Sequence, residues 1–261
     1  MKNTRILVCE DSIEGILTAV HEAYTSRYGL HDIRVVTKEP EPEFFTEIEY
    51  VQTNMVHAAS VAEAITRKIS KEAREVFMKA ACAADGEKAQ HLYRFLVCGF
   101  YMGAAVLQYQ SEPSVRYVSR LCKMVDREND KLKGFLRFYE LPNQVLFARI
   151  RPKHRQLELL QSHFDNRYPN ENFMICDVGR RIACVHQKHQ ESQLIGYEYL
   201  SQLLPAEEAM LENQDIYEGL WKAFFDATYI PQRKNTVLQS SMMAKRFWEF
   251  VPEMQNVTKN S

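Results

Sequence analysis

The spacing of apolar residues changes near Gly134, and this change most constrains the fold of the chain. Between residues 60 and 133 apolar residues recur every three or four positions, which is typical of helices buried on one face. After Gly134 a helix is predicted at residues 156–164. Short apolar runs on either side of it predict four strands, at residues 135–139, 145–150, 173–176 and 182–185.

This order of elements predicts an α+β fold, mostly helical, with a small antiparallel sheet from residues 135–185 that an N-terminal strand at residues 5–9 joins. The predicted organisation is a single compact domain over residues 1–254. Its parts are an N-terminal strand with helices (1–133), the sheet unit (134–186) and a C-terminal helical clamp (200–254), followed by a frayed tail (255–261).

Local signals refine these elements. Asp11 as N-cap, with Glu14 three residues later, predicts a helix from Ser12 to Tyr24. Pro113 in a first turn and Gly134 as a stop predict a helix over residues 114–133. Further predictions are extended segments at 33–36 and 45–51, and aromatic-rich helices at 216–228 and 237–250.

The composition indicates a protein of the cytoplasm. No window approaches the roughly 18 to 20 apolar residues of a membrane span, and the N-terminal apolar run is too short for a signal peptide. Six scattered cysteines without a C-x-x-C pair are expected to be reduced. We therefore expect cytoplasmic localisation and no membrane partner.

The net charge of −1 conceals an uneven distribution. Lys and Arg number 12 against 16 Asp and Glu in residues 1–113, 11 against 4 in residues 114–155, and 10 against 14 in residues 156–261. The three segments therefore have net charges of −4, +7 and −4. A concentrated positive segment in an otherwise acidic protein is typical of a local polyanion-binding surface.

The predicted helix at 114–133 aligns part of this charge. At 100° per residue, five cations fall within an arc of roughly 80°. These residues, named here the α-stripe, are Arg116, Arg120, Lys123, Arg127 and Lys131. Nucleic-acid phosphates would neutralise such a face. A solvated face, or one paired with acids from residues 1–113, is the structural alternative.

Other polar residues extend the predicted nucleic-acid-binding set. Lys133 and Arg137 follow the α-stripe, and a predicted turn after Asp177 places Arg180 and Arg181 at a hairpin tip. A solvated turn in which Asp177 pairs with an arginine is the alternative. The C-terminal candidates are Arg233, Asn235, Gln239 and Arg246.

Evidence for catalysis is sparse. Asp177 and Glu14 are the candidate catalytic carboxylates, although helix capping explains Glu14 more simply. Cys184, His186 and His189 have the residue types of a metal site but lack an identifiable fourth ligand. We therefore expect no metal and no cofactor.

Several motifs in fixed order resemble a bacterial family of domains of unknown function associated with DNA metabolism and DNA repair. The resemblance covers nearly the whole chain. Its motifs are Glu14-Gly15 with Leu17-Thr18-Ala19-Val20 and Glu22-Ala23-Tyr24, Lys133-Gly134-Phe135 with Arg137-Phe138, Asp177 with Arg180-Arg181, and Arg233, Asn235, Gln239, Met243, Arg246 and Trp248. The chain departs from the family pattern at Glu10-Asp11, Asp130, Gln232 and Ala244.

The resemblance implies a role but no reaction. Such domains are in some proteins fused to uracil-DNA-glycosylase-like domains, and otherwise accompany a radical-SAM protein. The expected function is DNA binding in repair or DNA metabolism, as an accessory to that radical-SAM partner. Two alternatives stay open: a DNA-acting hydrolase or base-processing enzyme that uses carboxylates, and a protein-binding adaptor without DNA contact.

Overall fold

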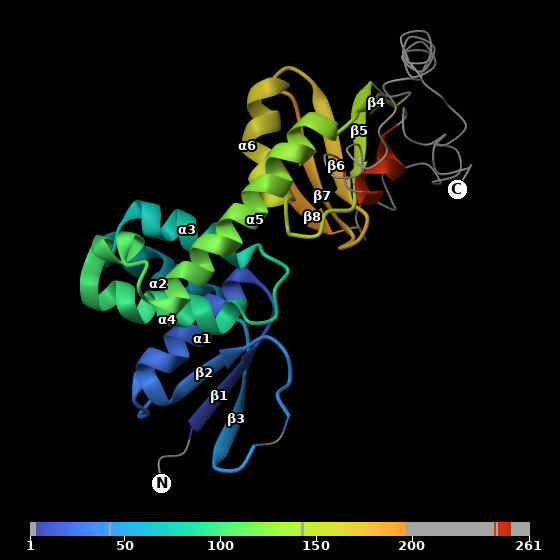
Figure 1. The fold of residues 1–261 in the computed structure, drawn as a ribbon. Helices are drawn as coiled ribbons and strands as arrows, with labels where there is room; N and C mark the ends of the chain where they lie inside the picture. The colour runs from blue at the N-terminus through green and yellow to red at the C-terminus, as the bar shows by residue number, and fades with distance from the viewer. Residues whose placement is uncertain (1–3, 42, 142–143, 197–242, 244, 252–261) are drawn as a thin grey trace, which may run out of the picture. The chain divides into compact units, whose positions relative to one another are not determined.

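The computed structural model describes residues 4–41, 43–141, 144–196, 243 and 245–251 (Figure 1). Helices and separate small sheets together confirm the predicted α+β class. Contacts within the chain fall into two compact units, Met1–Asp126 and Arg127–Ser261. The organisation as a single domain stays a prediction. Each unit has its own sheet.

The first unit contains a three-stranded parallel sheet in the order β2-β1-β3. Its strands are β1 (Thr4–Cys9), β2 (Ile33–Val36) and β3 (Thr46–Val51). Helix α1 (Ile13–Thr25) connects β1 to β2, since parallel neighbours need a crossover. The prediction that the N-terminal strand joins the sheet of residues 135–185 is wrong, because β1 pairs with the two strands nearest to it in sequence.

Three helices follow the sheet, where the apolar spacing predicts two or three. They are α2 (Met55–Lys68), α3 (Lys71–Ala81) and α4 (Lys88–Met102). Short 3-10 helices lie at η1 (Leu30–Asp32) and η2 (Gly103–Gln108). Among the helices that the structure describes, none combines the length and the apolar character that a bilayer span requires.

Lys88 ties α4 to the start of the chain. Its side chain is 2% exposed, and Nζ lies 2.6 Å from Asp11 Oδ1 and donates at 2.8 Å to the carbonyls of Ala81 and Ala83. Asp11 is therefore engaged in an ion pair, and the prediction that it is the N-cap of α1 is wrong. Ser12 caps α1 instead, because its Oγ accepts the Gly15 N–H at 2.9 Å.

The second unit contains a five-stranded sheet in the order β4-β5-β6-β7-β8. Its strands are β4 (Tyr139–Glu140), β5 (Val145–Ile150), β6 (Asn172–Asp177), β7 (Ile182–His186) and β8 (Gln193–Gly196). The predicted all-antiparallel pairing is wrong for β5 and β6, which are parallel. Helix α6 (Leu157–Arg167) connects them and returns the chain to the same end of the sheet.

Helix α5 (Pro113–Phe135) runs across the boundary between the units and ends two residues later than predicted. This extension shortens β4, which begins at Tyr139 and not at residue 135. Val115, Val118 and Val125 on its apolar face are buried, as predicted. The helix therefore has the amphipathic character that its sequence indicates.

The C-terminal aromatic residues pack on the second unit. Phe247 and Trp248 are 4% and 6% exposed and belong to the core cluster of Ile150, Phe164 and Phe173. The described part of the predicted helix at 237–250 is a 3-10 helix, η4 (Lys245–Phe250). The predicted helix at 216–228 and the predicted tail at 255–261 lie outside the described residues.

Two glycines give a matched test of how closely α1 packs against the residues that precede it. A Cβ at Gly15 would lie 2.5 Å from the Glu10 carbonyl oxygen, whereas a Cβ at Gly134, in the last turn of α5, would meet nothing within 4 Å. We predict that Gly15→Ala lowers the free energy of unfolding by about 1–3 kcal/mol. Gly134→Ala should raise it by up to about 1 kcal/mol, because alanine has the higher helix propensity. Urea denaturation followed by circular dichroism measures both changes, and equal shifts of the same sign would contradict the packing described.

Candidate nucleic-acid interface

The α-stripe lies on the solvent side of α5. Arg116, Arg120, Lys123 and Arg127 are exposed and Lys131 is half-buried. None of the five forms an ion pair with a carboxylate of the described residues. Arg116 Nη1 donates to the Gln110 carbonyl at 3.2 Å, and the Arg120 guanidinium lies 4.3 Å from the centre of the Tyr117 ring. The alternative in which acids of residues 1–113 neutralise the α-stripe therefore has no ion pair to support it among the described residues.

The acidic residues of α5 are directed elsewhere. Asp126 forms an ion pair with Lys79 of α3 at 2.8 Å, and Glu128 is 3% exposed. Asp130 is exposed and lies 3.6 Å from Lys133. None of these three carboxylates, all among the described residues, forms an ion pair with an α-stripe cation.

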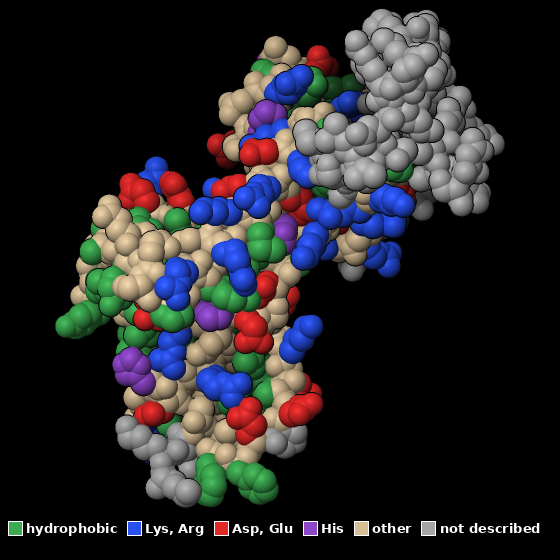
Figure 2. All heavy atoms as spheres, in the orientation of Figure 1, with side chains coloured by type: hydrophobic (Ala, Val, Ile, Leu, Met, Phe, Trp, Pro, Cys, Tyr) green, Lys and Arg blue, Asp and Glu red, His purple; other side chains and the backbone are tan. Residues whose placement is uncertain are grey.

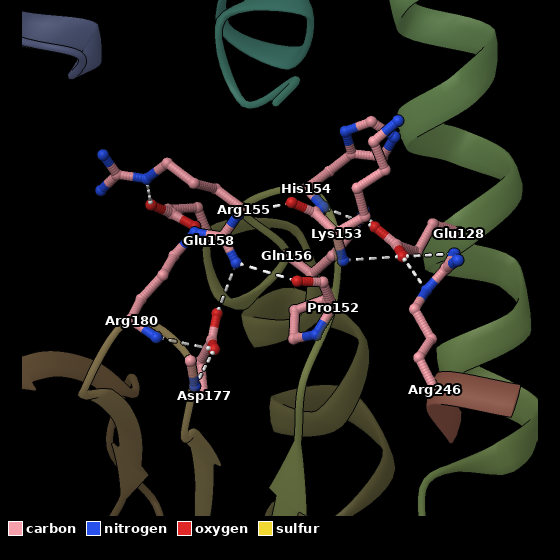
Figure 3. A network of polar contacts seen from close by, with 11 residues as sticks. Glu128, Pro152, Lys153, His154, Arg155, Gln156, Glu158, Asp177, Arg180 and Arg246 are labelled. Atoms are coloured by element: carbon pink, nitrogen blue, oxygen red, sulfur yellow. Dashed lines mark hydrogen bonds and ion pairs between the residues drawn. The ribbon is translucent and has the colours of Figure 1, made fainter. Parts of the chain in front are cut away.

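Glu128 organises a polar network within the second unit (Figure 3). Its carboxylate accepts the backbone N–H groups of Lys153 and His154 at 2.9 and 2.7 Å. It also accepts from Arg246 Nη2 at 2.8 Å and from Gln156 Nε2 at 3.4 Å. These hydrogen bonds offset the cost of burying the carboxylate.

A second buried carboxylate supports the same loop from another direction (Figure 3). Asp177, 1% exposed, accepts from the backbone N–H groups of Gly179 and Arg180 and from Arg180 Nη1 at 2.9 Å. The Arg180 guanidinium in turn donates to the carbonyls of Pro152 and Lys153 at 3.1 and 2.6 Å. The loop of residues 151–156, named here the basic loop, is therefore held through both its N–H and its carbonyl groups.

The basic loop presents cations to solvent from this fixed backbone. Lys153 is exposed, Arg151 is 55% exposed and lies 3.2 Å from Glu249, and Arg155 pairs with Glu158 at 2.8 Å. His154 is buried, and burial lowers the pKa of its imidazole although the nearby Glu128 raises it. His154 is therefore largely neutral at pH 7 and adds no charge to this surface.

The other predicted binding residues lie in different surroundings. Arg180 and Arg246 belong to the network around the basic loop, and Lys133 pairs with Asp130. Arg137 donates to the Gly134 carbonyl at 2.8 Å, and Arg181 is exposed at the hairpin tip with a φ of 56°. Three predicted residues lie outside the described ranges: Arg233, Asn235 and Gln239.

The candidate catalytic carboxylates occupy different units. Glu14 is half-buried on α1, and Asp177 follows the pattern of the structural alternative, pairing with Arg180 in a turn. A catalytic role for either residue stays a prediction. Sequence reasoning missed Glu128 as the centre of this network, although its position about 20° from Leu121 around the helix placed it on the apolar side.

Removing the charge of Glu128 tests its structural role. We predict that Glu128→Gln lowers the free energy of unfolding by about 2–3 kcal/mol, because the buried donors of the basic loop and Arg246 lose a charged acceptor. Hydrogen exchange at the Lys153 and His154 amides should accelerate in this variant. Asp130→Asn, an exposed change on the same helix, is the control and should behave as the wild type. Equal stability and exchange in the two variants would contradict the role of Glu128.

A family comparison covers the region that contains this network. A family model described as a domain of unknown function, DUF4130, matches residues 86–253. No curated protein matches the chain. The match spans more than half of the chain and includes α5, the basic loop and η4. The chain therefore belongs to the DUF4130 family of domains of unknown function.

Proposed function

We propose that this protein binds DNA through the α-stripe and the basic loop, and that it acts in DNA repair or DNA metabolism. The observation on which this proposal rests is the set of α-stripe cations, which have no carboxylate partner among the described residues. Like charges along one helix face repel one another in the free protein. A phosphate backbone would relieve this repulsion and release the counterions that it holds.

The second unit supports the proposal with a further group of cations. Figure 2 shows Lys and Arg side chains gathered on one face of this unit, around the position that η4 occupies in Figure 1. The exposed cations of this unit include Lys153, Arg181 and Lys245, and the carboxylates of Glu128 and Asp177 are buried. Cations on a backbone that buried carboxylates hold in place suit phosphate contacts, because little ordering is needed on binding.

The resemblance to a family associated with DNA metabolism supplies the biological setting of the proposal. In that setting the protein is an accessory that brings DNA to a radical-SAM partner of DNA-modifying function. The contacts expected from the α-stripe are with phosphates, which position a protein on nucleic acid without reading its sequence. We accordingly expect binding that depends little on base sequence.

Salt dependence tests the proposal directly. Five phosphate contacts would give a plot of log affinity against log salt concentration with a slope of about −4.5 for duplex DNA, and a shallower slope for single strands. Fluorescence anisotropy of labelled single- and double-stranded oligonucleotides at several salt concentrations measures these slopes. Tight binding to a protein partner, with none to either oligonucleotide, would contradict DNA binding and favour the adaptor.

Charge reversal tests the residues. Arg120→Glu combined with Arg127→Glu should leave folding intact, because both side chains are exposed. The affinity for DNA should fall at least about tenfold. The slope of log affinity against log salt concentration should become shallower by the equivalent of about two phosphate contacts. Lys71→Glu combined with Arg74→Glu makes the same charge change at exposed positions of α3 and is the control. An equal loss of affinity in both double variants would show that net charge, and not the α-stripe, determines binding.

A further inference from the structure

Two histidines and a glutamate converge between the first two helices of the first unit. His21 and Glu22 lie near the end of α1, and His57 lies in the first turn of α2. Glu22 Oε1 lies 3.4 Å from His21 Nδ1 and 3.3 Å from His57 Nδ1. Their ligand atoms all lie within 4.8 Å of one another, which no other set of three His, Cys, Asp or Glu side chains achieves among the described residues.

His57 Nδ1 lacks a partner suited to it. The atom is shielded from solvent and forms no hydrogen bond with any described group, although the Glu22 oxygen is near. The His21 and His57 rings are stacked, with centroids 3.9 Å apart and planes inclined by 19°. A ring nitrogen that is shielded from water and forms no hydrogen bond is unfavourable, and a bound metal ion would satisfy it.

The spacing of the three atoms suits a metal ion. Two ligands that bind zinc at about 2.0–2.1 Å in a tetrahedron are themselves separated by roughly 3.3–3.4 Å. The two nitrogen-to-oxygen separations here have these lengths, and rotation of one imidazole out of the stack would turn both Nδ1 atoms toward one ion. Two imidazoles and one carboxylate are also a common ligand set for zinc and neighbouring divalent metals.

The scaffold fixes the two helices that carry the three side chains relative to one another. Asn54 caps α2 by accepting the His57 N–H at 3.1 Å, and its backbone N–H donates to Thr18 Oγ1 at 3.1 Å. Thr18 is buried one turn before His21 and Glu22 on α1. This tie therefore lies one turn from the ligands on each helix and fixes the distance between them.

The geometry points to a binding site for a divalent transition metal ion, formed by His21, Glu22 and His57, with the fourth position open to water. Zinc is the probe that fits this set best. The side chains are 27%, 34% and 36% exposed, so that an ion can enter from solvent. The site is independent of the proposed DNA binding.

Zinc titration tests the site. Competition with a fluorescent zinc indicator should show one zinc ion bound per chain, with no competition from Mg²⁺, which prefers oxygen ligands. His57→Gln and Glu22→Gln should each weaken the affinity at least about tenfold. His189→Gln removes an exposed histidine of the second unit and should bind zinc as the wild type does.

Two further measurements protect this test against misfolding. Circular dichroism should show wild-type helix content for His57→Gln, because the side chain is partly exposed. Zinc should raise the unfolding temperature of the wild type and of His189→Gln, but not of His57→Gln. Absence of saturable zinc binding, or equal affinity in His57→Gln and His189→Gln, would overturn the proposal.

Discussion

The buried carboxylate of Glu128 is the interaction on which the second unit depends. A charge removed from water needs donors directed at it, and here the donors come from the basic loop and from Arg246 of η4. Glu128 and Arg246, 118 residues apart in sequence, thereby meet in one ion pair. The same constraint orients α5, because a helix that buries Glu128 turns the neighbouring Arg127 toward solvent.

The cations fall into two classes: those that pair with a buried carboxylate and those without a carboxylate partner among the described residues. Arg180 and Arg246 neutralise Asp177 and Glu128, and therefore serve the architecture of the basic loop. Arg120, Lys123 and Arg127 have no such acid among the described residues, and their charge is available to a ligand. Within the segment of net charge +7, Arg151 and Arg155 pair with Glu249 and Glu158, so the segment charge overstates what phosphates can reach.

Periodicity predicted the elements better than it predicted their partners. Strand β5 was predicted with its observed bounds, because Val145–Ile150 is an apolar run between turn residues. Strand β8 was missed, since its four residues follow a polar stretch and depend on pairing with β7. The cap of α1 was assigned one residue early, because the sequence does not reveal that Lys88 engages Asp11. The solvent-facing α-stripe follows from helix geometry alone, whereas the roles of Arg180, Arg246 and Glu128 depend on contacts distant in sequence.

The contacts of the buried Lys88 ammonium group affect where the chain can be truncated to produce the family segment alone. The DUF4130 match begins at residue 86, but the acceptors of the Lys88 ammonium, at Asp11, Ala81 and Ala83, all precede it. A fragment cut at the start of the match would leave a buried ammonium group without these three oxygens. The boundary of sequence similarity therefore falls inside the first unit, and a fragment that contains Lys88 also needs the β1–α1 turn and the end of α3.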